Sequence, residues 1–164
     1  MKSYALYLRT TVLGISDSLV STVGILAGVV VAGAPRETVI LTGVVYAFVE
    51  AFSMAVGSFL SEESFEEYLV KHDVADSPAF VSALIMFAVF VVSSLLLLMP
   101  YLVMPIALAL PVSIVLAVVA LFAASAVSAR AAEVPMLRRG LRMALLGGGA
   151  ILIGVLIGGF FPIH

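Results

Sequence analysis

The chain has 164 residues and a formal net charge of -2; 63% of its residues are hydrophobic and only 11% are charged. With a mean hydropathy of +1.28, it carries too little polar surface to cover a water-soluble core, since soluble domains have about a quarter charged residues. This excludes a soluble enzyme. The few basic residues are scattered, which argues against a nucleic-acid-binding module, and the absence of cysteine excludes disulfides and thiolate metal sites. We therefore expect an integral membrane protein.

Five continuous apolar runs predict five membrane-spanning α-helices. A helix needs about 20 apolar residues to cross the hydrocarbon layer, and these runs lack the apolar-polar alternation of a membrane barrel. Each run is bounded by charge, proline or both, and the approximate spans are 11–33, 38–61, 80–99, 103–129 and 141–161. We expect an all-α, single transmembrane domain over residues 1–164, with a short acidic segment at 62–79 between the second and third spans.

The distribution of basic residues predicts the orientation, because short cytoplasmic loops carry an excess of Lys and Arg. Only Arg36 lies in a loop on one side of the five spans. The other seven fall on the opposite side: Lys2, Arg9, Lys71, Arg130, Arg138, Arg139 and Arg142. This places the N-terminus in the cytoplasm and the C-terminus outside. The short loops, and a start without an organellar targeting pattern, favour a prokaryotic plasma membrane.

Two acidic residues lie inside apolar spans, Asp17 in the first and Glu50 in the second. A carboxylate at the centre of a membrane helix costs about 2.5–3.5 kcal/mol on insertion scales. No Lys or Arg lies at comparable depth in any span. The acids are therefore either protonated or part of a site that admits cations and water. A third interpretation of Asp17 is a helix-end carboxylate held at the interface by Arg9, Arg130 or Arg138.

The expected depths bring these acids together with a sulfur atom. At 1.5 Å per residue, Asp17 lies about 9 Å inside the cytoplasmic boundary. Met54, on the returning helix, lies at about the same depth, and Glu50 is one turn deeper on the same face. Carboxylate oxygen with thioether sulfur suits Fe(II), Mn(II), Co(II) or Zn(II) better than Ca(II) or Mg(II). The three residues predict transport of a transition metal ion.

Four further acids follow the second span: Glu62, Glu63, Glu66 and Glu67. If the helix continues into the cytoplasm, they form two like-charged pairs four residues apart, which repel unless solvated or bridged by cations. They are either a solvated helix face or a patch that collects metal ions at the inner mouth of the path. His72 lies nearby and is compatible with the second interpretation.

Small residues at helical spacing indicate close helix packing. They are Gly24 and Gly28 in the first span, Gly57 in the second, and Gly154 and Gly158 in the fifth. We expect these glycines to serve packing or assembly rather than conduction.

Two segments resemble the first and second transmembrane helices of the vacuolar iron transporter family: GISDSLVSTVGILAGV at residues 14–29 and EAFSMAVGSFLSEES at residues 50–64. The resemblance implies a homodimer that exports Fe(II), and often Mn(II), from the cytoplasm in exchange for protons along a path between the subunits. It also implies that Asp17 and Met54 of each subunit are ligands in that path. The metal ion is then the transported substrate, and no resident cofactor is expected.

The chain departs from the family pattern at three points. Ser18 stands where members commonly have glycine, and Tyr46 stands where an acidic residue is expected, with Glu50 as its candidate substitute. The long glutamate-rich cytoplasmic domain of better-known members is reduced to the short acidic segment. The alternative function is a non-transporting membrane scaffold or partner-binding subunit; an enzyme is not expected, because no HExxH or GxSxG spacing occurs.

Overall fold

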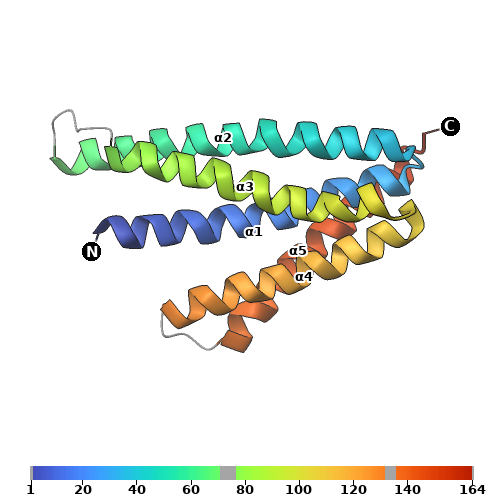
Figure 1. The fold of residues 1–164 in the computed structure, drawn as a ribbon. Coiled ribbons are helices and arrows are strands. Elements are labelled where there is room, and N and C mark those ends of the chain that lie inside the picture. Colours follow the sequence, from blue (N-terminus) through green and yellow to red (C-terminus); the bar gives the residue numbers. More distant parts are fainter. Residues whose placement is uncertain (1, 71–76, 132–135, 164) are drawn as a thin grey trace.

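The computed structural model describes residues 2–70, 77–131 and 136–163. These residues form five α-helices: α1 (Lys2–Val31), α2 (Arg36–Val70), α3 (Ser77–Val103), α4 (Ile106–Ala131) and α5 (Met136–Phe160). Each of the five is long and apolar enough to cross a membrane. The expected all-α class with five transmembrane helices is confirmed. The two ends of the chain lie at opposite ends of the bundle, which are called its N-terminal and C-terminal ends below (Figure 1).

Helix α1 is the centre of the bundle, since it packs against all four other helices. Helix α2 packs chiefly against α3 and makes fewer contacts with α1. In Figure 1, α1, α2 and α3 run side by side, whereas α4 and α5 cross beneath them and diverge from α2 toward the N-terminal end. The interface between α1 and α2 is therefore the least tightly packed around α1.

The buried apolar core joins α1, α3 and α4. Leu19 and Val23 of α1 contact Leu97 of α3 and Leu121 of α4 in one cluster. A second cluster at the C-terminal end includes Leu26, Leu98 and Tyr101 and extends to the first turns of α2 and α4. Both clusters leave the α1–α2 interface at the N-terminal end outside the apolar core.

Helices α1 and α3 run in the same direction and are fixed in register by two hydroxyl pairs. Thr10 pairs with Ser82 at 2.7 Å, and the hydroxyl of Thr22 donates to that of Ser94 at 2.9 Å. Both pairs are buried and join residues 72 positions apart. The pairs lie 12 residues apart on each helix, which is about 18 Å. Hydrogen bonds between side chains of this kind hold helices together in lipid.

The backbones of α1 and α5 cross closely at four of their glycines, which are Gly24, Gly28, Gly154 and Gly158. A Cβ atom added at Gly28 would lie 2.8 Å from the carbonyl oxygen of Gly154, and one added at Gly154 or Gly158 would also lie under 3.0 Å from a carbonyl oxygen of α1. Only glycine permits this approach. Gly24 contributes from the α1 side, where its added Cβ would lie 3.0 Å from the carbonyl oxygen of Ala150. By contrast, a Cβ at Gly57 would meet no described atom within 4 Å, so Gly57 does not mark a helix crossing within this chain.

Helix α1 ends in a Schellman motif at Gly33, whose φ of 85° is the left-handed conformation that glycine adopts without strain. The Gly33 amide donates to Val30, and the Ala34 amide donates to Val29. Two residues later, Arg36 reaches across to the end of α3. Its Nε donates to the carbonyl oxygen of Tyr101 at 2.7 Å, and its Nη2 donates to that of Leu102. The guanidinium thus satisfies carbonyl groups that the end of a helix leaves unpaired.

Four helices are longer than the apolar runs suggested, and one of them, α5, begins at Met136 rather than near residue 141. Helix α1 begins at Lys2 rather than near residue 11, because its polar first turns extend beyond the apolar run. Helix α2 continues to Val70, so the glutamates at 62–67 lie on a helix; glutamate is a good helix former where water solvates it. Helix α3 continues through Pro100 to Val103, since proline removes one backbone donor but its own carbonyl still accepts from Met104.

Candidate functional site

A line of side chains spaced four residues apart runs along the half-buried side of α2. It consists of Tyr46, Glu50, Met54, Ser58 and Glu62, each of intermediate burial. Of the side chains between them, Phe52 is exposed and Ala51 is buried. A four-residue spacing follows one ridge of a helix, and the line extends about 24 Å at 1.5 Å per residue. A polar and sulfur-containing track therefore crosses most of the apolar segment.

At the deeper end of this track, α1 contributes Asp17 and Ser21. The hydroxyl of Tyr46 lies in the neighbourhood of the Ser21 side chain and of the carboxylates of Glu50 and Asp17. Ser21 also donates to the backbone carbonyl of Asp17 at 2.6 Å. Tyr46 therefore lies near both intramembrane acids, one from each helix. The convergence of Asp17, Glu50 and Met54 stays a prediction.

At the N-terminal end, the track opens into a pocket of about 390 Å³ between α1, α2 and α3. The lining residues are Arg9, Thr10, Leu13, Ser53, Met54, Gly57, Ser58, Ser61, Glu62 and Met86. The lining therefore includes hydroxyl-bearing residues, an ion pair and two methionines. Asp17 and Glu50 do not line it. Within one chain, Met54 thus lines the pocket, Glu50 lies one turn further along the track, and Asp17 belongs to α1.

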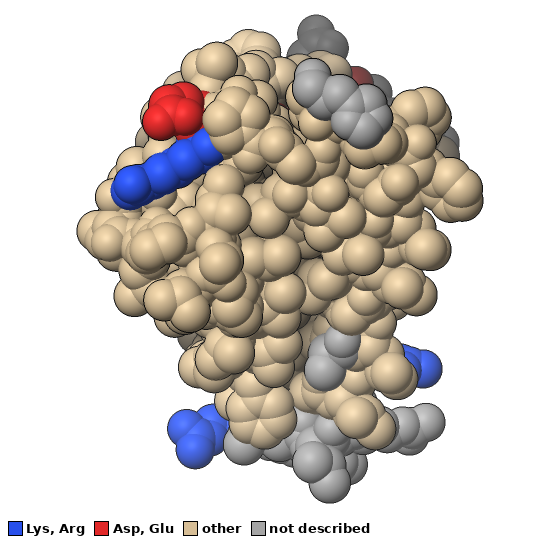
Figure 2. All heavy atoms as spheres, turned by 90° about the vertical axis from the view of Figure 1, so that its right-hand side faces the viewer, with Lys and Arg blue, Asp and Glu red and all other residues tan. Residues whose placement is uncertain are grey.

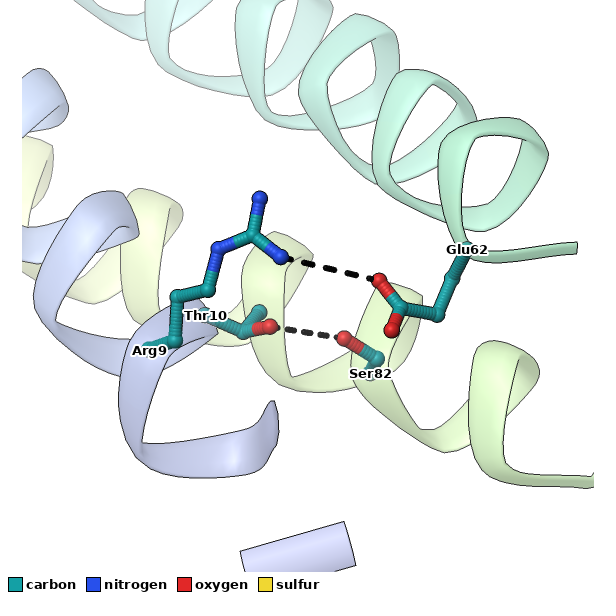
Figure 3. A network of polar contacts seen from close by, with 4 residues as sticks. All are labelled: Arg9, Thr10, Glu62 and Ser82. Carbon is teal, nitrogen blue, oxygen red and sulfur yellow. Dashed lines mark hydrogen bonds and ion pairs between the residues drawn. The ribbon is translucent and has the colours of Figure 1, made fainter. Parts of the chain in front are cut away.

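The four glutamates at positions 62–67 differ in their surroundings. Glu62 lines the pocket and pairs with Arg9, with 4.0 Å between the carboxylate and guanidinium atoms (Figure 3). Its side chain is 16% exposed, whereas that of Arg9 is 72% exposed. Glu63 and Glu66 are half-buried and Glu67 is exposed, and none of these three lines the pocket. His72, which the sequence associates with this patch, lies outside the described residues.

The ion pair bears on the interpretation of Asp17 as an interfacial acid held by arginine. Arg9 pairs with Glu62, and Asp17 forms no ion pair among the side chains that the structure describes. Arg138 is not one of those side chains. No group of three or more His, Asp or Glu residues that could surround a metal ion occurs within the described ranges. One chain therefore presents two acids and a thioether along a line rather than a closed metal cage.

Three features of the site were not predicted. Met86 reaches the pocket from α3, but in the sequence it is one methionine within an apolar run. The pairing of Arg9 with Glu62 depends on the extension of α2 beyond the apolar span. Tyr46 was noted only as a departure, although its position four residues before Glu50 could have placed it on the same ridge.

The opposite end of the bundle carries little charge. Figure 2 looks onto the C-terminal end, where an acidic and a basic side chain lie together at upper left and the central surface is uncharged. Arg36 and Glu37 belong to the first turn of α2 at this end. The glutamates of the α2 extension all lie at the N-terminal end.

The fold and the track together define a multi-pass helical membrane protein with polar groups at membrane depth. The model of the VIT family matches residues 8–77 and 65–159. The chain belongs to the VIT family, and its class of function is membrane transport of metal ions; members of this family are transporters rather than enzymes. No curated protein matches the chain.

Proposed function

We propose that the protein exports Fe²⁺, Mn²⁺ or both from the cytoplasm in exchange for protons, with Asp17, Glu50 and Met54 lining the path. The supporting observation is the track of Tyr46 to Glu62 on α2, which connects a polar pocket to two intramembrane acids. Acidic residues inside membrane spans are taken as functional by default, because the free-energy cost of inserting them makes them rare outside ion and substrate pathways. Family membership favours this function over a non-transporting scaffold.

The choice of ions rests on the donor atoms. Mg²⁺ and Ca²⁺ select sites built from oxygen alone, whereas the path combines carboxylates with the thioether of Met54. Thioether sulfur favours softer ions. Mn²⁺ and Fe²⁺ lie between these classes and accept both kinds of ligand.

A homodimer completes the path. Asp17, Glu50 and Met54 are only partly buried in one chain, and a partly exposed carboxylate facing lipid is costly. A second copy placed against the open side of the α1–α2 interface covers these groups and doubles the ligands around a central ion. Native mass spectrometry should then give twice the 17.1 kDa of one chain; a monomer that still transports ions would contradict the shared path.

The direction of transport follows from the positions of the charges. From the excess of Lys and Arg in the loops at the N-terminal end we infer that this end faces the cytoplasm. Four glutamates there would attract cations to the inner mouth: Glu62, Glu63, Glu66 and Glu67. A carboxylate holds either a proton or a metal ion, so arrival of one displaces the other. This competition couples outward movement of metal to inward movement of protons.

The experiment uses the purified full chain in liposomes that contain a metal-quenched dye. External Fe²⁺ or Mn²⁺ should enter faster than into protein-free liposomes, and faster still when the lumen is acidic, because protons then leave as metal enters. Mg²⁺ should enter much more slowly. Flux no greater than in empty liposomes would contradict transport of these ions. Equal flux with and without the pH gradient would contradict only the exchange for protons.

A further inference from the structure

The pocket at the N-terminal end is lined by two methionines that are far apart in sequence. Met54 enters from α2 and Met86 from α3, and both line the same volume of about 390 Å³. The intramembrane acids do not line this volume, so it is distinct from the deeper part of the path. Its polar members come from α1 and α2, and Met86 is the contribution of α3.

The structure fixes where Met86 lies. Its side chain is 2% exposed, and a Cβ atom added at Gly14 would lie 3.0 Å from its sulfur. The sulfur therefore packs against the backbone of α1 at a residue without a side chain. The Thr10–Ser82 hydroxyl pair lies one helical turn away and holds α1 and α3 in this register. Packing against α1 therefore fixes the side chain of Met86 beside the pocket.

The Arg9–Glu62 ion pair at the pocket allows a metal ion to replace the guanidinium on the carboxylate. Glu62 is largely enclosed, and its partner Arg9 is mostly exposed on the solvent side, with 4.0 Å between them (Figure 3). A partly exposed ion pair at this distance is weak. An incoming divalent cation carries twice the charge of the guanidinium and can take its place on the carboxylate.

We propose that this pocket is an entrance site for a thiophilic divalent metal ion, bound by the thioethers of Met54 and Met86 and the carboxylate of Glu62, with Arg9 occupying that carboxylate until the ion arrives. Serine hydroxyls or water complete the coordination. Two thioethers select softer ions such as Fe²⁺, Co²⁺ and Cd²⁺ over Mg²⁺. The inference rests on the proposed function only for the role of the site in supplying the deeper path; binding at the site does not require transport.

The test is equilibrium binding to the purified full chain, with Cd²⁺ as the soft probe and Mn²⁺ as the harder one. Met86→Leu keeps the volume and removes the sulfur, so Cd²⁺ affinity should fall by about tenfold while Mn²⁺ affinity changes little. Met99→Leu is the matched control, because Met99 lies on the same helix, is 53% exposed and does not line the pocket. An unchanged ratio of Cd²⁺ to Mn²⁺ affinity in Met86→Leu would overturn the site.

Arg9→Gln gives a second readout with the opposite sign. Removing the guanidinium frees Glu62, so Cd²⁺ should bind more tightly, whereas a merely structural ion pair would leave the affinity unchanged or weaken it. Asp17→Asn should retain Cd²⁺ binding at the pocket, which separates this site from the deeper path. Should Met86→Leu fail to fold, crystals of the unaltered protein soaked in Cd²⁺ should show an anomalous peak beside the Met86 sulfur; a peak only at other residues would contradict the proposal.

These outcomes are independent of the transport assay. Unaltered protein that moves no Fe²⁺ or Mn²⁺ would contradict the proposed function and leave the binding result standing. The entrance site alone would be contradicted if the protein transports both ions but Met86→Leu and Arg9→Gln leave its metal affinities and its ion preference unchanged.

Discussion

Gly154→Ala tests the close crossing of α1 and α5. The added methyl carbon would lie less than 3.0 Å from the carbonyl oxygen of Gly24, whereas a carbon and an oxygen in contact need about 3.3 Å. The carbonyl is part of one backbone, and the position of a Cβ atom is fixed by the other. No rotamer change therefore relieves the overlap. The two helices must separate, and the neighbouring Gly28–Gly158 contact loosens with them.

The magnitude follows from two opposing terms. Overpacking a well-packed site costs about 1–3 kcal/mol, and a clash between backbones belongs at the upper end of that range. Alanine gains about 1 kcal/mol over glycine in a helix interior. The net loss is about 2 kcal/mol, which lowers Tm by about 4–8 °C for a chain of this size. Gly159→Ala meets no described atom within 4 Å and retains only the favourable term, so its Tm should stay level or rise.

Both variants can be compared in detergent by heating a fluorescent-protein fusion and measuring the folded fraction by size-exclusion chromatography. The two substitutions are chemically identical and lie five residues apart on one helix, so expression and detergent effects cancel. A Gly154→Ala protein as stable as the Gly159→Ala control would refute the backbone crossing.

Three further predictions concern single contacts. Arg36→Gln should lower Tm by about 2–8 °C, since it removes charge-assisted hydrogen bonds to the end of α3 that contribute about 1–2 kcal/mol; an unchanged Tm would contradict this cap. Thr22→Val should cost about 1 kcal/mol, and a double-mutant cycle with Ser94→Ala should show that the two losses are not additive, whereas additive losses would mean that the hydroxyls do not interact. Tyr46→Phe should reduce Fe²⁺ flux severalfold without lowering Tm, because it removes only the hydroxyl between the two acids; flux equal to that of the unaltered protein would exclude a role in the path.

The number and class of the helices could be predicted because lipid imposes a simple rule: every span must be long, apolar and hydrogen-bonded within itself. The ends of the helices could not. Helix α2 extends to Val70 through a charged stretch that hydropathy excludes, since hydropathy reports the thickness of the membrane rather than the length of the helix. The glycines of α1 and α5 predicted close packing, but nothing in their spacing identified the partner helix.

Candidate site residues can be proposed from the sequence where a residue violates the rule for lipid. Asp17 and Glu50 are conspicuous because carboxylates are rare at membrane depth, and Met54 follows from its spacing to Glu50. Met86 is apolar and breaks no rule, so only the packing of α3 against α1 places it at the pocket. The Arg9–Glu62 pair likewise depends on which helices are neighbours, and this information lies in the tertiary fold.

The central claim is that metal ions cross the membrane along the acids between α1 and α2. Fe²⁺ uptake into liposomes by Asp17→Asn, at matched protein density, tests it most directly, with Glu37→Gln as the control because that acid lies in the first turn of α2 at the other end of the bundle. We predict that Asp17→Asn retains the fold but loses nearly all flux, while Glu37→Gln transports like the unaltered protein. Equal flux in all three proteins would contradict the proposed path.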